Sequence, residues 1–225
     1  MEFLIDTANL EEIKKGIRFY PISGLTSNPS ILKREGKINF FEHLKKIREI
    51  ITDKRSLHVQ VIAEDADGIL KDAKAILKNV DKDVFIKIPV TPAGLSAMQI
   101  LKQEGINVTA TAVYSLMQGY LALACGVDYI VAYFNRMENL NIEPTSIISA
   151  LSEKIYGEGL KSKVMGASYK NVRQVNQSFE AGASSATVDL SILETVFAMP
   201  SISKAVNDFS KDWVSVFGNK TIAEL

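Results

Sequence analysis

The sequence has little cysteine, no excess of charge of either sign and no long apolar run. Cys125 is the one cysteine among 225 residues, so an internal disulfide bond is excluded and a reducing compartment is expected. The 26 basic and 26 acidic residues balance, whereas nucleic-acid and membrane-surface proteins need a basic excess. The longest largely apolar stretch, 120–134, contains Asp128 and is too short to cross a bilayer. The first residues lack the pattern of a signal peptide, so we expect a soluble, cytoplasmic protein.

Histidine is also scarce, which limits the chemistry that the sequence supports. His43 is predicted on a helix surface, and His58 near the start of a strand, on the rim opposite a barrel's active site. No HxH, HExxH or CxxC spacing is present, so metal chemistry has little support. With both histidines away from the expected site, a Ser-His-acid triad is not predicted either.

Apolar strands alternate with amphipathic helices along the chain. Strands are predicted at 3–5, 22–25, 57–62, 84–90, 107–111, 129–132, 163–167 and 184–188, each followed by a helical pattern. This alternation is typical of a parallel sheet, and eight units favour an α/β fold of the single-domain (β/α)8 TIM-barrel type. A doubly wound open sheet is the alternative, but its first turn normally carries glycines. The corresponding turn here, Asp6-Thr7-Ala8-Asn9, has none.

An extra helix follows the eighth unit. Ile202, Phe209, Trp213 and Val216 form an apolar stripe at helical spacing. We therefore divide the chain into a barrel, residues 1–200, and a carboxy-terminal helical tail, residues 201–225. An apolar stripe of this size has to be buried, either on a neighbouring subunit or back across the same barrel.

The fourth predicted strand carries a lysine in apolar surroundings. In Val84-Phe85-Ile86-Lys87-Ile88-Pro89-Val90, Lys87 lies near the carboxy-terminal end of a strand predicted to be buried on both faces. Desolvation lowers the pKa of a lysine, and a neutral amine is a nucleophile that forms Schiff bases with carbonyl substrates. The alternative is that Lys87 extends past the strand end to solvent or to a carboxylate.

Polar side chains follow the predicted strands at the end where barrel enzymes have their active sites. They are Asp6, Thr26, Asn28, Gln60, Lys87, Thr111, Tyr133, Arg136, Ser168, Lys170 and Asp189. Asp6 could be a plain N-cap, but Asn9, with Glu12 after it, already fits the N-cap of the first helix, which leaves Asp6 available as a general base. Gln60 interrupts an apolar strand, so its amide has to meet water or another polar group.

Three of these side chains have ordinary structural interpretations as well. Thr26 and Asn28 also fit a simple Asn-Pro turn. Arg136 and Ser168 follow late strands of the barrel, where phosphate is often bound, and the planar arginine fork suits phosphate. Arg136 fits a surface ion pair with Glu138 equally well.

Several separated motifs resemble those of one enzyme family. They are Asp6-Thr7-Ala8, Gly24-Leu25-Thr26-Ser27-Asn28-Pro29-Ser30, Ile86-Lys87-Ile88-Pro89-Val90-Thr91, Asn135-Arg136, Ala167-Ser168 and Asp212-Trp213. In this order they resemble the transaldolase family of class I aldolases, and within it the small fructose-6-phosphate aldolases. The resemblance extends over the whole chain.

The resemblance implies catalytic roles for five residues. Lys87 corresponds to the Schiff-base lysine, and Asp6 to the base that acts on the hydroxyl at the cleaved carbon. Gln60, Thr111 and Tyr133 correspond to residues that hold a proton-shuttling water.

The resemblance also implies how the substrate is bound. Thr26 and Asn28 correspond to residues that hold hydroxyls of the dihydroxyacetone part, and Arg136 and Ser168 to residues that take the phosphate. No metal or organic cofactor is implied. The tail is expected to pack on a neighbouring subunit in a homo-oligomer, a pentamer or a decamer.

The implied reaction is the reversible cleavage of fructose 6-phosphate to dihydroxyacetone and glyceraldehyde 3-phosphate. The alternative is a transaldolase of the pentose phosphate pathway, which passes the three-carbon unit to an acceptor aldehyde. Transaldolases carry glutamate and phenylalanine where this chain has Gln60 and Tyr133, which favours the aldolase. Val131-Ala132 departs from the Ala-Pro of close relatives and predicts an altered donor preference. A catalytically silent phosphosugar-binding barrel is disfavoured, because it should lack Lys87 or Asp6.

Overall fold

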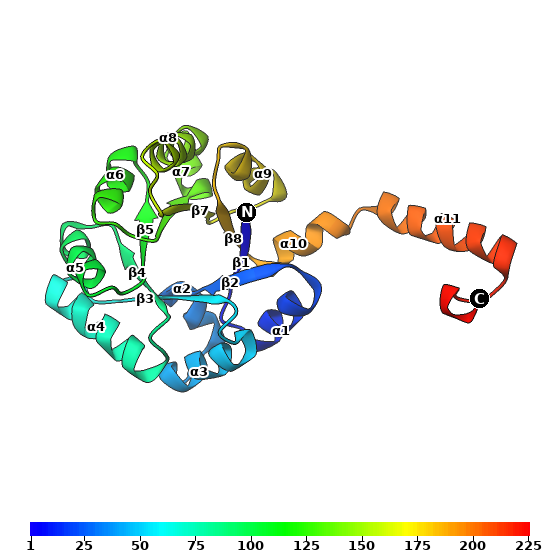
Figure 1. Ribbon diagram of the computed structural model, residues 1–225, viewed down its shortest axis with the longest axis horizontal. Helices are drawn as coiled ribbons and strands as arrows, with labels where there is room; N and C mark the ends of the chain where they lie inside the picture. The colour runs from blue at the N-terminus through cyan, green and yellow to red at the C-terminus, as the bar shows by residue number, and fades with distance from the viewer.

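The structure, a computed structural model, describes residues 1–225. Eight parallel strands form a closed barrel in which β1 pairs with both β2 and β8 (Figure 1). The strands are β1 (Glu2–Asp6), β2 (Ile22–Thr26), β3 (Ser56–Gln60), β4 (Phe85–Pro89), β5 (Val108–Val113), β6 (Tyr129–Tyr133), β7 (Lys163–Ala167) and β8 (Ser185–Val188). Their bounds differ from the predicted ones by at most two residues, so the predicted barrel is confirmed.

A helix follows every strand and covers the outside of the barrel. The long helices are α1 (Leu10–Phe19), α3 (Phe40–Ile51), α4 (Ala66–Asn79), α5 (Pro92–Gln103), α6 (Leu116–Ala124), α8 (Pro144–Gly157), α9 (Val172–Glu180) and α10 (Leu190–Phe197). Two short helices, α2 (Pro29–Leu32) and α7 (Phe134–Asn139), were not predicted. The 3₁₀ turn η1 (Lys33–Glu35) continues α2 directly. Both α2 and α7 begin within three residues of a strand end, so they shape the active-site rim of the barrel.

The main apolar core lies between the strands and the surrounding helices. Outward-facing strand residues such as Ile5, Ile86 and Ile130 share this core with helix residues such as Leu44 and Leu151, and all five are inaccessible to solvent. Burial of each such side chain contributes ~1.5–3 kcal/mol, which holds the helices on the barrel. None of the helices is both long enough and apolar enough to span a membrane.

The barrel lumen is packed on the amino-terminal side of Lys87. The ring of His58, the third residue of β3, stacks on Phe85 with centroids 4.6 Å apart and meets Tyr129 edge-on at 5.0 Å. His58 lies away from the active-site end, as predicted, but it is buried inside the lumen rather than at the opposite rim. Because β3 begins at Ser56 and its side chains alternate, His58 is mid-strand and points into the lumen.

Polar groups close the amino-terminal end of the lumen. Lys163 forms an ion pair with Glu2, and the Tyr129 hydroxyl donates to the same carboxylate at 3.0 Å. Burial, with the nearby Glu2 carboxylate, raises the pKa of Tyr129 to about 12, so the hydroxyl keeps its proton and remains a donor. The lumen therefore contains packed side chains rather than a channel, as is usual in this fold.

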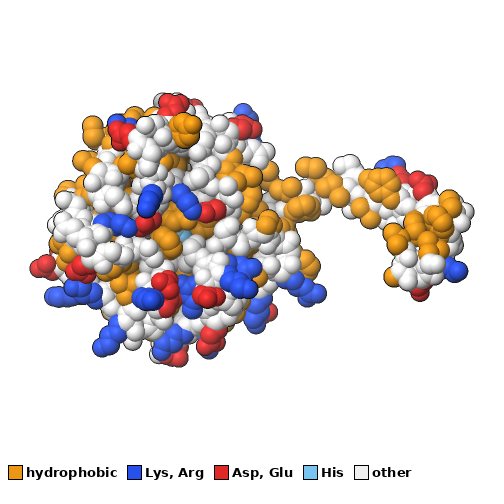
Figure 2. Space-filling model, viewed as in Figure 1, with side chains coloured by type: hydrophobic (Ala, Val, Ile, Leu, Met, Phe, Trp, Pro, Cys, Tyr) orange, Lys and Arg blue, Asp and Glu red, His pale blue; other side chains and the backbone are white.

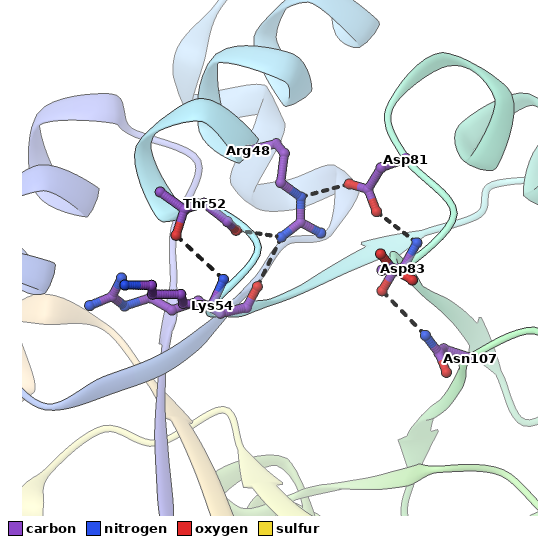
Figure 3. Close-up of polar contacts among 7 residues, drawn as sticks. Arg48, Thr52, Lys54, Asp81, Asp83 and Asn107 are labelled. Carbon is purple, nitrogen blue, oxygen red and sulfur yellow. Dashed lines mark hydrogen bonds and ion pairs between the residues drawn. The ribbon is translucent and has the colours of Figure 1, made fainter.

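A polar network fastens the same end of the barrel between β3, β4 and β5 (Figure 3). Arg48 of α3 donates to Asp81 at 2.6 Å and to the backbone carbonyls of Thr52 and Arg55. The Asp83 backbone N–H then donates to Asp81, and the Asp83 carbonyl accepts from the Asn107 side chain. These bonds join the end of one helix to the loops that enter three strands, opposite the predicted active site.

The last long helix, α11 (Pro200–Phe217), projects away from the barrel (Figure 1). It contains no buried residue, and Phe209 and Val216 are both 71% exposed. Its apolar side chains are visible along the carboxy-terminal arm in Figure 2. The alternative that the tail packs back across its own barrel is therefore not observed.

Candidate active site

Lys87 lies at the centre of the candidate site. Its side chain is 2% exposed, although it reaches a cavity at the carboxy-terminal end of the barrel. The amine donates to the backbone carbonyl of Ser27 at 3.4 Å and forms no ion pair. The structural alternative required Lys87 to reach bulk solvent or a carboxylate, and it reaches neither. A buried ammonium group without a counter-ion is costly, so stability does not explain a lysine at this position.

Asp6 lies at the end of β1 and faces the same cavity. Asn9 caps α1 by accepting from the N–H groups of Glu11 and Glu12, so Asp6 is not the cap. Asp6 instead accepts from the Thr26 hydroxyl at 2.5 Å. Thr26 in turn lies 2.6 Å from the hydroxyl of Thr187. Since Thr26 donates to Asp6, Thr187 donates to Thr26, and this chain fixes the carboxylate at the mouth of the barrel.

The cavity has a volume of about 130 Å³. Six of the predicted site residues line it: Asp6, Asn28, Lys87, Tyr133, Arg136 and Ser168. Ser30, Arg34, Tyr169, Lys170, Thr187 and Asp189 also reach it. The other three predicted residues, Thr26, Gln60 and Thr111, do not line it. Thr26 and Thr111 nevertheless bond to residues that do.

Tyr133, the last residue of β6, brings a hydroxyl to the cavity. That hydroxyl is 3.0 Å from the Thr111 hydroxyl, and both residues are buried. The register between β5 and β6 shifts between Ala110 and Val113, and Ala112 has φ of +58°. Such bulges re-aim side chains next to active sites, and this one lies beside Thr111.

Arg136 of α7 and Ser168 of the loop after β7 both line the cavity. The Arg136 guanidinium is 4.7 Å from the centre of the Tyr133 ring and donates to the Tyr114 hydroxyl at 3.2 Å. It does not pair with Glu138, because side chains two apart on α7 do not face each other. Ser168 has φ of +63°, a strained backbone conformation for a residue other than glycine. Such strain clusters at functional sites.

Asn28 serves both the fold and the cavity. Its side-chain oxygen accepts from the Ile31 N–H at 3.1 Å and caps α2, as the turn interpretation required. The residue also lines the cavity. A cap fixes the side chain, so its amide N–H groups have a defined direction at the rim.

Comparison with known proteins identifies the family. A family model for transaldolase/fructose-6-phosphate aldolase matches residues 3–221. The chain belongs to this family. A probable fructose-6-phosphate aldolase of Streptococcus pneumoniae (strain ATCC 700669 / Spain 23F-1) is 52% identical over 222 residues, which cover 99% of this chain and 100% of that protein. The resemblance found in the sequence motifs is therefore confirmed.

A solved structure supports the fold alone. The flavin-binding domain of baker's yeast flavocytochrome b2 superposes with a TM-score of 0.57 at 11% identity. The match covers 84% of this chain and 57% of that chain. At this identity the likeness concerns the barrel architecture and not the chemistry.

Gln60 and Tyr133, the two residues that distinguish the aldolases from the transaldolases of this family, line two different cavities. Tyr133 reaches the cavity, whereas Gln60 lines a neighbouring apolar groove of about 410 Å³ with residues such as Phe40 and Phe41. The Gln60 side-chain oxygen is buried and has no hydrogen-bond partner in the protein. The structure pairs the Thr111 and Tyr133 hydroxyls, and the register that sets Gln60 beside Lys87 places the Gln60 side chain on the lumen side of β3. Val131 is fully buried in the lumen, two residues before Tyr133.

Thr187, Arg34 and Tyr169 line the cavity but were missed by sequence reasoning. Thr187 was not singled out, although the polar Ser185 and Thr187 alternate with apolar residues along β8, a pattern that indicates an inward polar face. Arg34 lies in η1, and no sequence pattern indicated the short helical segment that brings it to the cavity. Its guanidinium is 4.0 Å from Asp189. Burial, and then the charge of Asp6, raise the pKa of Asp189.

The described residues hold no group of three or more His, Cys, Asp or Glu side chains placed to bind a metal ion. The residues that converge on the cavity are instead an amine, two carboxylates, hydroxyls and basic side chains. This set suits covalent and acid–base chemistry on a polar, anionic substrate.

Proposed function

We propose that this protein is a Schiff-base aldolase that reversibly cleaves fructose 6-phosphate to dihydroxyacetone and glyceraldehyde 3-phosphate. The observation that carries the proposal is the buried Lys87 amine, which has no counter-ion and shares its cavity with Asp6. Family membership and the 52% identical relative, a probable fructose-6-phosphate aldolase, support the same reaction.

Lys87 begins the reaction by adding to the ketone carbon of the sugar phosphate. Loss of water gives an iminium ion, which can accept the electron pair released when the adjacent carbon–carbon bond breaks. Asp6 removes the proton from the hydroxyl at the carbon that becomes the aldehyde. The aldehyde leaves as glyceraldehyde 3-phosphate, and the three-carbon unit remains on Lys87 as an enamine.

A proton delivered to the enamine carbon completes the cleavage. The Tyr133 and Thr111 hydroxyls, 3.0 Å apart at the cavity, are suited to hold the water that delivers it. Addition of water to the resulting iminium ion then releases dihydroxyacetone and frees the amine. A transaldolase instead passes the enamine to an acceptor aldehyde. The Tyr133–Thr111 pair favours the hydrolytic outcome, and we assign Gln60 a supporting role in the same step.

The two ends of the substrate meet different groups. Arg136 and Ser168 are assigned to the phosphate, because a guanidinium from α7 and a hydroxyl from the loop after β7 provide charge-assisted bonds to its oxygens. Thr26 and Asn28 are assigned to the hydroxyls of the dihydroxyacetone part. Asn28 faces the cavity directly, whereas Thr26 acts through its bond to Asp6. No metal or organic cofactor takes part in this scheme.

Borohydride trapping tests the proposed reaction directly. Wild-type protein incubated with fructose 6-phosphate and borohydride should gain one reduced three-carbon adduct on Lys87, located by mass spectrometry of peptides. Lys87→Met should abolish the adduct and the cleavage activity while keeping the far-UV circular dichroism spectrum, because methionine suits the apolar surroundings. Labelling that persists on another lysine, such as Lys170, would contradict the assignment.

We further propose that residues 201–225 form a tail that packs on a neighbouring copy of this chain in a homo-oligomer, a pentamer or a decamer. The support is the exposed apolar face of α11, which includes Ile202, Val206 and Phe209, and its projection from the barrel (Figure 1). An isolated chain leaves this face in water, which is unfavourable for so many apolar side chains. Size measurements on the truncated protein, described in the Discussion, test the proposal.

A further inference from the structure

One buried amide joins α7, which carries Arg136, to the loop after β7, which carries Ser168. Gln174 of α9 is only 5% exposed. Its side-chain oxygen accepts from the Lys170 backbone N–H at 2.6 Å. Its side-chain nitrogen donates to Asn135 at 3.0 Å and also to the Glu138 carboxylate. A single side chain thus bonds the loop after β7 to the segment after β6.

Both attachment points lie next to the residues assigned to the phosphate. Asn135 immediately precedes Arg136 in α7, and Lys170 is two residues after Ser168. The strained backbone at Ser168, with φ of +63°, persists only where its surroundings hold it. The bond from Gln174 to the Lys170 N–H is one such restraint, because it fixes the chain just beyond the strained residue.

Gln174 has no free N–H donor for a substrate in this arrangement. A glutamine amide offers two N–H donors and one oxygen. Both donors and the oxygen already have protein partners, and the residue does not line the cavity. Its role is therefore to hold other groups in place rather than to contact the reacting molecule.

We infer that Gln174 is a positioning residue that sets the spacing between Arg136 and Ser168 and thereby the affinity for the phosphate end of the substrate. The inference rests on the proposed function for the identity of the substrate, but the anion site itself depends only on α7 and the loop after β7. Two groups that must meet the same phosphate need a fixed separation, and displacement by about 1 Å can cost ~10²-fold in rate. Gln174 provides the only side-chain hydrogen bonds that join the loop after β7 to α7.

The test compares two acceptor aldehydes in the synthesis direction with dihydroxyacetone. In Gln174→Met, KM for glyceraldehyde 3-phosphate should rise about tenfold or more, while kcat/KM for unphosphorylated glyceraldehyde stays within about twofold of wild type. Gln177→Met is the matched control, since Gln177 is on the same helix and forms no side-chain hydrogen bond. Equal losses with both aldehydes would mean a merely structural role and would overturn the inference.

An exchange of the two side chains provides the rescue. In Gln174→Glu with Glu138→Gln, the carboxylate accepts from the Lys170 N–H and from the new amide at position 138. Asn135 can rotate its amide to donate to the same carboxylate. This double variant should recover most of the preference for the phosphorylated aldehyde that Gln174→Met loses. Failure of the exchange to recover any of it, with a native circular dichroism spectrum, would count against hydrogen bonding as the cause.

Binding of inorganic phosphate gives a readout that does not depend on catalysis. Titration calorimetry should show affinity about tenfold weaker for Gln174→Met than for wild type and for Gln177→Met. If phosphate binds wild type and Gln174→Met equally, the positioning role is wrong whatever the reaction is. If wild type forms no aldol product while phosphate binding still depends on Gln174, the proposed function fails and the positioning role stands.

Discussion

Acid should destabilise this protein through His58, and replacing His58 should remove that sensitivity. The ring is inaccessible to solvent, lies between Phe85 and Tyr129, and has Thr109 and Ser56 hydroxyls 2.8 and 3.0 Å from its two nitrogens. Burial, and then the positive charge of Lys87, lower the pKa of His58 from 6.5 to about 3. The positive charges of Arg48 and Lys163 act in the same direction.

The sign and size of the effect follow from this lowered pKa. The unfolded chain binds a proton at His58 below pH 6.5, whereas the folded chain binds it only near pH 3. Stability is therefore full above pH 6.5 and falls as the pH drops from about 6.5 towards 3. Each pKa unit corresponds to ~1.4 kcal/mol, so His58 should remove about 2 kcal/mol of stability between pH 7 and pH 5. The full loss, below both values, is on the order of 5 kcal/mol.

Urea unfolding of wild type, His58→Gln and His58→Phe between pH 7 and pH 5 measures this difference. Far-UV circular dichroism is the suitable probe, because the one tryptophan, Trp213, lies in α11 and does not report on the barrel. One protein concentration is used throughout, since assembly contributes to stability. The two variants will differ in absolute stability, but both should lose about 2 kcal/mol less than wild type over this range. If all three proteins lose the same amount, His58 is not held neutral and the reasoning is refuted.

Three other changes give separate tests. Tyr133→Phe should lower dihydroxyacetone release by ~10²-fold or more, because positioned proton transfer is lost. It should also raise the fraction of the three-carbon unit that is transferred to erythrose 4-phosphate, and adding Gln60→Glu should raise that fraction further. An unchanged ratio of the two products would exclude control of the water by Tyr133. Deletion from Ser201 onward should give smaller particles in light scattering while the barrel's circular dichroism signal is kept; an unchanged assembly mass would contradict packing by the tail. Arg48→Met should lower the free energy of unfolding by about 1–3 kcal/mol, because it removes the ion pair to Asp81 and two hydrogen bonds to backbone carbonyls (Figure 3). Urea denaturation at pH 7 measures this loss of stability.

The sequence predicted the barrel because its eight apolar strands and its capped helices repeat on a short period. Asn9, for example, caps α1 at the position that its spacing with Glu12 indicated. The short helices α2 and α7 were missed, because four to six residues next to a strand carry too little periodicity to be recognised. Arg34 was missed for the same reason, since it reaches the cavity from the turn that continues α2.

The positions of the polar residues at the strand ends could be predicted from the sequence, but the contacts between them could not. The bond between Asp6 and Thr26 and that between Thr111 and Tyr133 depend on barrel register, and the second also lies beside a bulge at Ala112. Gln60 illustrates the limit, because its strand position did not reveal that its side-chain oxygen would be buried without a hydrogen-bond partner in the protein. The roles assigned to all these residues stay predictions until the substitutions are made.

The packed lumen beneath Lys87 makes the site a well with a single opening. Because His58, Phe85 and Tyr129 fill the space below the amine, nothing enters or leaves through the other end of the barrel. A fragment bonded to the floor of such a well must depart after any fragment held nearer the opening. The phosphorylated aldehyde would thus always leave before the ketone, and a new aldehyde can enter while the three-carbon unit is still attached. Shape thereby imposes an order of departure that no individual side chain has to enforce.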